Sequence, residues 1–514
     1  MQVTKIPFAQ TGSFASLFLD YVAERDSLRD FYAWSPEPAG FAAALKQRSF
    51  PDSQRQQLVA VLKEQYEGLE QSPRLQENID LLGRKNTFTV TTGHQLNIFT
   101  GPLFFLYKII TTINICHELG RQHPEYHFVP VYWMGSEDHD LAEINHIFID
   151  GQKYEWHTGQ TGAVGRMKPD GLAELAAELP GRTAVFAEAY SKMPTLATAT
   201  RYYVNALLGH TGLVVLDPDH RQLKRHFLPV VQQELTGQVV YKEIEEQNKQ
   251  LHDAGYKPHL NPREINLFYL DEGIRERIDK QGEHYVVTNT SLRFNEQEIL
   301  ALAEEEPEKF SPNVILRPVY QETILPNLGY VGGPSELSYW LQFKKLFKAL
   351  QVDFPVLMPR NFCLYLNKNA QRKMARLELA AEDLFLPLAE LQKKYVKKHS
   401  AIDLTAARQG IEQVYAGVRD QAADIDVTLV PHVEGRLKKH LADLDRIETK
   451  MIRAVKRQQQ EAMQRLAWLK EYAFPGGIPQ ERYLNYLAIA EADFLDQVQQ
   501  HTDPFDLRMH VLWE

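Results

Sequence analysis

The sequence predicts an α/β core domain with a largely parallel sheet, followed by an α-helical coiled-coil domain. Short β-rich runs alternate with longer helical stretches between about residues 85 and 370, which is the pattern of a parallel sheet covered by helices on both faces. After about residue 370 the pattern becomes helical and charged, and a seven-residue apolar repeat begins at Val430. The chain of 514 residues, 44% hydrophobic and 24% charged, is long enough for about two to four folded domains.

The elements of the core follow from the periodicity of its apolar residues. The first 85 residues are predicted to be helical, with Leu58, Val61 and Leu62 at helical spacing. Residues 151–195, rich in glycine and proline, and residues 235–312, which mix polar loops with short β-like pieces, are expected to be insertions near the mouth of the site. We therefore expect a core at residues 1–375 and a helical domain at 376–514. The predicted strands are 88–92, 128–134, 213–217, 324–331 and 354–358, and the predicted helices are 102–119, 195–208, 221–235 and 336–350.

The C-terminal repeat predicts a coiled coil. His440 breaks one d position, and the spacing then slips to Val455, Ala462 and Leu469, which predicts a stutter. The helix expected at 369–399 is a candidate antiparallel partner. Both a dimer through this domain and an intramolecular helical hairpin fit the pattern. The repeat comprises Val430, Val433, Leu437, Leu444, Ile447, Met451 and Ala454.

Charge and cysteine content exclude several classes of protein. With 57 Lys and Arg against 67 Asp and Glu the net charge is −10, so any phosphate or nucleic-acid binding would have to be local. Cys116 and Cys363 lie in apolar stretches, which excludes a disulfide framework and indicates a reducing compartment. The first residues lack the layout of a signal peptide, and no apolar run approaches the roughly 18 residues of a membrane span. We expect a soluble cytoplasmic protein.

The first candidate site is the segment 91–102, where a strand enters a glycine-containing loop and Pro102 stands where a helix should begin. Free backbone N–H groups at such a junction favour an anion. The spacing is neither G-x-G-x-x-G nor a P-loop, so an ordinary strand-to-helix turn is the alternative. The side chains and glycines expected to contact a ligand here are Gly93, His94, Gln95, Asn97, Thr100 and Gly101.

The second candidate site follows the strand 128–134. Glu137 would bind substrate, and Asp138, His139 and Asp140 are the candidate catalytic residues, for acid/base work or for holding amines. If a helix starts near Ser136, residues 139, 143 and 146 share one face. The alternatives are helix caps, which explain one or two of these acids, and a divalent metal site, which we do not favour because the cluster is rich in acids.

The third candidate site is the segment 316–340, where a strand ends at Gly332 and Gly333 and Pro334 opens a helix with Glu336 in its first turn. Arg317, beside an apolar strand, needs a carboxylate or phosphate partner. Three further residues are candidates. Asp217 ends a strand and could bind hydroxyls or amines or cap the next helix, and Arg263 and Asn266 in the second insertion could close over a ligand.

Together these motifs resemble the cysteine ligase family of bacillithiol biosynthesis. The resemblance rests on Thr92-Gly-His-Gln95, Phe99-Thr-Gly-Pro102, Glu137-Asp-His-Asp140 and Tyr330-Val-Gly-Gly-Pro334, and spans essentially the whole chain. One departure is His94, where many members are expected to have glutamine. The resemblance implies the last step of bacillithiol synthesis, in which L-cysteine is added to glucosaminyl-malate with formation of an amide bond.

The resemblance also implies a Rossmann-like core with connecting insertions and a coiled-coil domain that forms a homodimer. The name ligase and the fold likeness imply ATP (ADP) as an activating nucleotide, whereas the residues themselves indicate no firm cofactor and no metal. The partners expected are the two small-molecule substrates, without nucleic acid or membrane. Two alternatives remain open: a metal-dependent hydrolase that uses the acid–histidine cluster at 137–146, and a non-catalytic nucleotide-binding coiled-coil scaffold.

Overall fold

The computed structural model describes residues 1–489 and 491–514, which form two compact units. The first unit contains Met1–Ala9, Ser13–Leu364 and Glu481–Leu512, and the second contains Gln10–Gly12, Tyr365–Gln480 and Trp513–Glu514. The chain thus leaves the first unit after Leu364, earlier than the sequence suggested, and returns to it at Glu481. No helix in the described ranges is long and apolar enough to cross a membrane.

A parallel five-stranded sheet, in the order β13-β12-β2-β3-β6, forms the centre of the first unit. The strands β2, β3 and β6 follow one another along the chain and extend the sheet on one side of β2. The chain then crosses to the other side of β2, where β12 and β13 are added. This reversal is the Rossmann arrangement, which confirms the predicted fold class, and it opens a crevice between the carboxyl ends of β2 and β12. The strands are β2 (Thr87–His94), β3 (His127–Met134), β6 (Val214–Leu216), β12 (Asn327–Gly332) and β13 (Val356–Pro359).

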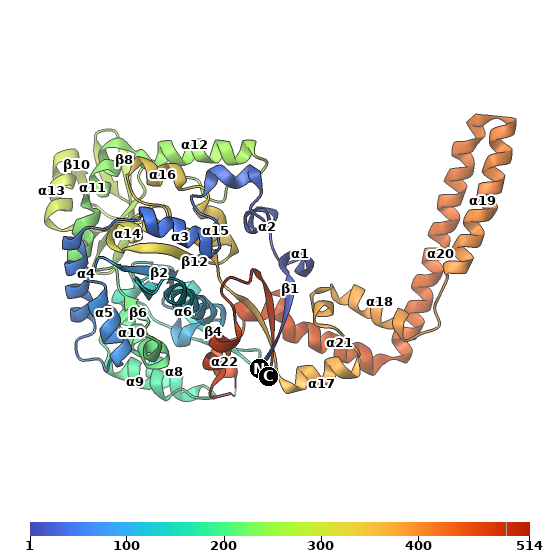
Figure 1. Ribbon diagram of the computed structural model, residues 1–514, viewed down its shortest axis with the longest axis horizontal. Helices are drawn as coiled ribbons and strands as arrows, with labels where there is room; N and C mark the ends of the chain where they lie inside the picture. Colours follow the sequence, from blue (N-terminus) through green and yellow to red (C-terminus); the bar gives the residue numbers. More distant parts are fainter. Residues whose placement is uncertain (490) are drawn as a thin grey trace. The chain divides into compact units, whose positions relative to one another are not determined.

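Helices cover both faces of this sheet (Figure 1). On one face α3 (Pro38–Gln47) and α6 (Phe104–Gln122) pack on β2, β12 and β13 around Phe41, Val90 and Val331. On the other face α14 (Leu316–Ile324) contacts β3, where the rings of Tyr320 and Trp133 are 5.3 Å apart. The helices α4 (Asp52–Gln65), α10 (Leu196–Leu208) and α11 (Arg221–Gly237) complete the layers. Because both faces are covered, the strands are apolar throughout.

Two predicted boundaries in the core are wrong. The strand expected at 324–331 begins only at Asn327, because Leu316–Ile324 form α14. The helix expected at 336–350 is two helices, α15 (Pro334–Trp340) and α16 (Lys344–Ala349). Pro326, between α14 and β12, was a local signal for the first boundary, whereas residues 341–343, between α15 and α16, include neither glycine nor proline.

The insertions flank the carboxyl edge of the parallel sheet. The first holds a hairpin of β4 (His146–Ile149) and β5 (Gln152–Glu155), then α8 (Leu172–Glu178) and α9 (Ala184–Lys192). The second holds α12 (Val239–Asp253), α13 (Glu296–Glu305) and an antiparallel sheet in the order β10-β9-β8-β7-β11. The two insertions meet where the Thr161 hydroxyl donates to the Gly273 carbonyl at 2.9 Å. The strands of this sheet are β7 (Leu267–Asp271), β8 (Ile274–Gln281), β9 (His284–Val287), β10 (Arg293–Asn295) and β11 (Phe310–Pro312).

The C-terminal segment 481–512 belongs to the first unit because it is bound there by buried polar contacts. Arg360, which follows β13, forms an ion pair with Glu481 at 2.5 Å, and both side chains are almost fully buried. A three-stranded sheet places β15 (Arg508–Trp513) between β1 (Gln2–Pro7) and β14 (Phe362–Leu366). Composition alone did not distinguish this returning segment from the helical domain.

The second unit is helical, as predicted, and its longest helices form an antiparallel hairpin of α19 (Thr405–Ile425) and α20 (Val430–Gln458) (Figure 1). The predicted partner at 369–399 is wrong. That segment divides into α17 (Lys368–Arg376) and α18 (Leu388–Lys398), with a 3-10 turn at Ala381–Phe385 between them and Pro387 as the N-cap of α18. The intramolecular hairpin, one of the two alternatives, is therefore formed.

The seam of α20 differs from the strict seven-residue repeat. Ile447 and Met451, expected in the seam, are 52% and 40% exposed. The covered stripe drifts with the roughly 3.6 residues per turn of a straight helix. The expected stutter near Val455 is instead a break, since α20 ends at Gln458 and α21 (Gln460–Ala473) follows it. The less exposed positions are Val430, Val433, Leu437, Leu441, Leu444, Glu448 and Ile452.

Candidate active site

An ion pair between the buried Lys108 and the partly buried Glu336 lies in the crevice between β2 and β12. The Lys108 ammonium on α6 donates to both carboxylate oxygens of Glu336, at 2.9 and 2.8 Å, and to the Gly93 carbonyl at 2.6 Å. The Tyr330 hydroxyl and the Gly333 N–H also donate to Glu336, each at 2.8 Å. The chain's own carboxylate thus occupies the Gly332–Gly333 junction, which the sequence offered to an external anion.

This pair remains charged despite its burial. Burial tends to raise the pKa of Glu336, but the Lys108 ammonium and the donated hydrogen bonds lower it to about 2. Burial lowers the pKa of Lys108, and Glu336 acts in the opposite direction. A carboxylate that accepts four hydrogen bonds from three donor groups is held rigidly, and so this pair fixes the ends of β2 and β12 relative to each other.

Arg317 and His94 border this pair, and each has a buried nitrogen without a hydrogen-bond partner among the described residues: Nη2 of Arg317 and Nε2 of His94. Arg317 lies on α14 rather than beside a strand, and its guanidinium is 5.3 Å from the Tyr330 ring. Gly93 permits this approach, since a Cβ there would lie 3.2 Å from Arg317 Nη1. Burial and Lys108 lower the pKa of His94 to about 3, so its ring, stacked on Phe105, is neutral at physiological pH.

The loop 97–101 has a structural role in this conformation. Asn97 donates to the Glu143 carbonyl at 3.1 Å, and Asn485 donates to the Gly101 carbonyl at 2.6 Å. Gly101 needs its glycine, because its φ is +60° and a Cβ would lie 2.6 Å from that of Asn97. Thr100 is buried with φ +68°. The helix α6 begins at Phe104, not at Pro102, and the Leu103 N–H donates to the Leu484 carbonyl, so this one donor is already used.

The acid–histidine cluster lies in the loop after β3. Asp138 accepts from Gln95 Nε2 at 3.0 Å and lies 3.6 Å from Arg275 Nη1, which comes from β8 of the second insertion. The expected helical face is wrong, because α7 is only Leu141–Ile144 and the chain then turns into β4 at His146. Asp140 caps α7 by accepting from the Glu143 N–H at 3.3 Å.

Arg275 determines the charge state of this cluster, which we call the Arg275 cluster (Gln95, Asp138, His139, Arg275). Burial tends to raise the pKa of Asp138, but Arg275, Gln95 and the His139 N–H lower it below its ordinary value. Arg275 Nη1 is 2.5 Å from His139 Nδ1. Because a guanidinium can only donate, Nδ1 is the acceptor and the proton of the neutral ring is on Nε2. Asp138 is therefore an anion suited to hold an ammonium group.

Glu137 follows β3, and Asp217 follows the neighbouring strand β6. Glu137 is buried against Lys224 of α11, and the Lys224 ammonium also donates to the Phe310 carbonyl at 2.7 Å. Burial raises the pKa of Glu137. Asp217 accepts from the Ser136 hydroxyl at 2.5 Å, and burial raises its pKa. Asp217 lines a cavity with a volume of about 430 Å³. The charged residues and the histidine that line it are Arg166, Asp217, Asp219, His220, Arg221 and Glu308.

Asn266 is bound to other groups of the second insertion and of α11, whereas Arg263 is exposed. Asn266 is buried and donates to Glu234 at 2.8 Å and to the Arg263 carbonyl at 2.7 Å. The Arg263 side chain is exposed. Sequence reasoning missed Arg275, Lys224 and Asn485, because each reaches its partner from a segment more than 80 residues away along the chain. An arginine within a charged strand carries no local signal of that contact.

Two further features bear on the chemistry: the arrangement of possible metal-ligating side chains and the state of the cysteines. Within residues 1–489 and 491–514, no group of three or more His, Cys, Asp or Glu side chains is arranged to hold a metal ion. Cys116 and Cys363 are buried free thiols, and burial raises the pKa of both. A buried thiol with a raised pKa is a poor nucleophile.

Both units of the chain are similar to proteins of one known family. Residues 1–361 match the family described as "Bacillithiol biosynthesis BshC, N-terminal Rossmann-like domain", and residues 363–514 match its "C-terminal coiled-coil domain". A protein of Flavobacterium johnsoniae is 40% identical, covering 94% of this chain and 93% of its own. Proteins of Christiangramia forsetii and Cytophaga hutchinsonii are 38% and 36% identical, covering 100% and 99% of this chain and 99% and 98% of their own. All three are named "Putative cysteine ligase BshC".

Proposed function

The chain belongs to the BshC family of bacillithiol biosynthesis, and we propose that it is a carbon–nitrogen ligase that performs the last step, the addition of L-cysteine to glucosaminyl-malate. The observation that carries the proposal is the Arg275 cluster at the carboxyl end of β3, next to the crevice between β2 and β12. Ligands of open α/β sheets bind at this edge. A charged cluster there, in a family of proteins named for cysteine ligation, supports small-molecule chemistry on amines and carboxylates.

Each substrate carries groups that this edge can bind. Asp138 would hold an ammonium group, since its lowered pKa keeps it ionised. Arg317, with its unpartnered Nη2, would bind a carboxylate of cysteine or malate. Lys108 and Glu336 would position Arg317 and Gly93 rather than contact substrate, because their charges satisfy each other.

Amide formation requires an activated cysteine carboxyl group and a neutral glucosamine nitrogen. The nitrogen attacks the carboxyl carbon, loses a proton, and the activating group departs with the electron pair of the broken C–O bond. ATP (ADP) is the activating nucleotide that the ligase chemistry implies. The Leu103 N–H and the Gly333 N–H already donate to oxygens of the protein, and we assign no residue to the nucleotide.

The Asp138→Asn variant tests this assignment. It keeps the side-chain shape and removes the charge, so formation of the cysteine amide should fall by about 10²-fold or more while the melting temperature stays near that of the wild type. Asp279→Asn is the matched control, since Asp279 lies on β8 with Arg275 but pairs with Arg277. The assay follows cysteine consumption and product mass from both substrates, with and without ATP and with a chelator.

Three results would contradict the proposal. Full activity in a folded Asp138→Asn variant would remove this cluster from the mechanism. Bound zinc near one ion per chain, with a loss of activity on chelation that excess Mg²⁺ does not restore, would favour the metal-dependent hydrolase. No consumption of cysteine under any nucleotide condition would favour the non-catalytic scaffold.

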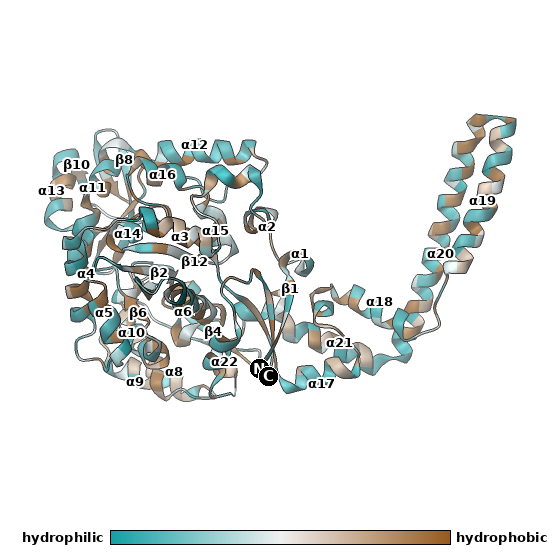
Figure 2. Cartoon of the chain, in the orientation of Figure 1, coloured by the Kyte–Doolittle hydropathy of each residue, from teal (hydrophilic) through white to brown (hydrophobic). Residues whose placement is uncertain are grey.

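We also propose that the chain forms a homodimer through the α19–α20 hairpin. Val414 and Val418, one turn apart on α19, are 65% and 45% exposed, and apolar residues gather at the turn of the hairpin (Figure 2). An exposed apolar stripe on a helical hairpin is typical of an oligomer contact. Sedimentation should show a dimer at micromolar concentration, and Val414→Glu with Val418→Glu should shift it to a monomer. Gln413→Glu on the same helix is the control, and a monomeric wild type would contradict the proposal.

A further inference from the structure

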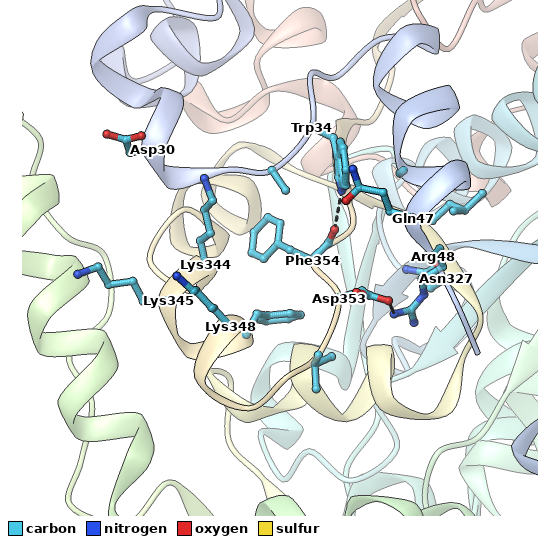
Figure 3. Close-up of a pocket in the computed structure, with 15 residues that line it drawn as sticks. Asp30, Trp34, Gln47, Arg48, Asn327, Lys344, Lys345, Lys348, Asp353 and Phe354 are labelled. Atoms are coloured by element: carbon cyan, nitrogen blue, oxygen red, sulfur yellow. Dashed lines mark hydrogen bonds and ion pairs between the residues drawn. The ribbon is translucent and has the colours of Figure 1, made fainter. Parts of the chain in front are cut away.

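A second cavity lies at the opposite edge of the parallel sheet from the candidate active site. Its volume is about 410 Å³, within the range of about 300–1,000 Å³ that is typical of small-molecule sites. Asn327 and Leu328, at the start of β12, form part of its lining, whereas the crevice is at the other end of that strand. The remaining walls come from residues 30–34, from α3 and from α16 with the loop that follows it (Figure 3).

Cations outnumber carboxylates around this cavity: its lining holds Arg48, Lys344, Lys345 and Lys348 but only Asp30 and Asp353. Arg48 uses Nη1 to bind Asp353 at 2.8 Å. Lys345 points away toward α12 (Figure 3), where it pairs with Glu246. These contacts neutralise one cation each and leave Lys344 and Lys348.

Lys344 and Lys348 form no ion pair in the ranges that the structure describes, although Asp30 attracts Lys344 over a longer distance. They lie one turn apart on α16, an arrangement in which like charges repel. Burial lowers the pKa of Lys344, which shows that its surroundings already disfavour the positive charge. An anion between the two ammonium groups would offset both effects.

Aromatic side chains line the same cavity. The Trp34 indole N–H donates to the Phe354 carbonyl at 2.9 Å, so the orientation of the indole is fixed (Figure 3). The Phe354 ring lies 5.0 Å from that of Phe347, which also lines the cavity. Such a wall favours a flat apolar group, because buried aromatic faces gain from stacking.

We propose that this cavity binds a small aromatic anion, whose phosphate, sulfonate or carboxylate is held by Lys344 and Lys348 and whose ring lies against Trp34 and Phe354. The site is separate from the proposed ligase site. It lies at the amino ends of the strands, and none of its residues belongs to the Arg275 cluster or contacts Glu336.

A fluorescence titration of the full chain with 8-anilinonaphthalene-1-sulfonate tests the proposal, since this probe joins a sulfonate to flat rings. We expect saturable binding of one equivalent that inorganic pyrophosphate displaces. The double variant K344Q/K348Q should weaken binding by about tenfold or more, because it removes both charge-assisted contacts. Lys345→Gln is the matched control, with affinity within about twofold of the wild type.

An unchanged affinity in K344Q/K348Q, with the melting temperature preserved, would overturn the proposal. Equal weakening by Lys345→Gln would overturn it as well, because the effect would then follow net charge rather than this cavity. The single variants Lys344→Gln and Lys348→Gln are measured alongside, so that a folding defect in the double variant does not decide the result.

Discussion

Replacing Glu336 by glutamine should destabilise the first unit substantially. The substitution keeps the side-chain shape but leaves the Lys108 ammonium, which is 1% exposed, without its counter-ion. In the fold the pKa of Glu336 is lowered from its ordinary value of 4.5 to about 2. At about 1.4 kcal/mol per pKa unit, this difference corresponds to about 3 kcal/mol of stability at neutral pH. Breaking a buried pair by removing one partner costs about 3–5 kcal/mol, which agrees.

The pH dependence of this contribution has a definite sign. Because the pKa in the fold is depressed, the stabilisation is fully present above the ordinary value of 4.5 and is lost as the pH falls toward about 2. The wild type should therefore lose stability over this interval. The Glu336→Gln variant should lack that part of the loss, since it has no carboxyl to protonate.

Urea unfolding followed by tryptophan fluorescence at pH 7 and pH 4 measures both effects. The double variant K108M/E336Q is the control, because removing both charges leaves no unpaired ion and should be less destabilising than Glu336→Gln alone by about 1 kcal/mol or more. A loss below about 1 kcal/mol in Glu336→Gln, or additive losses in the double variant, would refute the view that this pair fastens β2 to β12.

Three further predictions concern other parts of the first unit. Arg317→Lys should raise KM for the substrates about tenfold or more with the fold intact, because lysine cannot reproduce a bidentate carboxylate contact. Steady-state kinetics measures this change in KM, and an unchanged KM would exclude the contact. Gly101→Ala should lower the free energy of unfolding by about 1–3 kcal/mol or more, because the φ of residue 101 is +60° and a Cβ there would contact Asn97. Thermal melting measures this loss, and an unchanged melting temperature would contradict the prediction. Cys116 and Cys363 should resist iodoacetamide in the native chain and react fully in urea, because both thiols are buried, and rapid native labelling would contradict that reading.

The family expectation and the main division of the chain followed from sequence alone. The strands around Gly93, Glu137 and Gly332 were identified because a buried parallel strand is a short, continuous apolar run bounded by glycine or acids. Their common edge was predictable as well, since parallel strands place all their carboxyl ends together. The helical character of residues after about 370 also followed from local periodicity.

Local pattern did not reveal which groups at that edge were already bound to the protein. The Gly333 N–H was a free donor by sequence, yet Glu336 three residues later occupies it. Asp138 and His139 were predicted as site residues from their own segment, whereas their partner Arg275 comes from the second insertion. Nothing in the spacing of residues indicates a contact across 137 positions, because it depends on how the insertion folds back.

The same distinction holds for the coiled coil. Sequence determined that residues 430–458 form a helix with one apolar side, because that property depends only on neighbours three and four positions away. The choice of α19 as partner, the drift of the seam and the exposure of Ile447 depended on tertiary packing. Short-range periodicity therefore determined the elements and the edge of the sheet where chemistry is expected, and only the folded chain decided which charges are paired and which remain for a ligand, since pairing is set by distance in space.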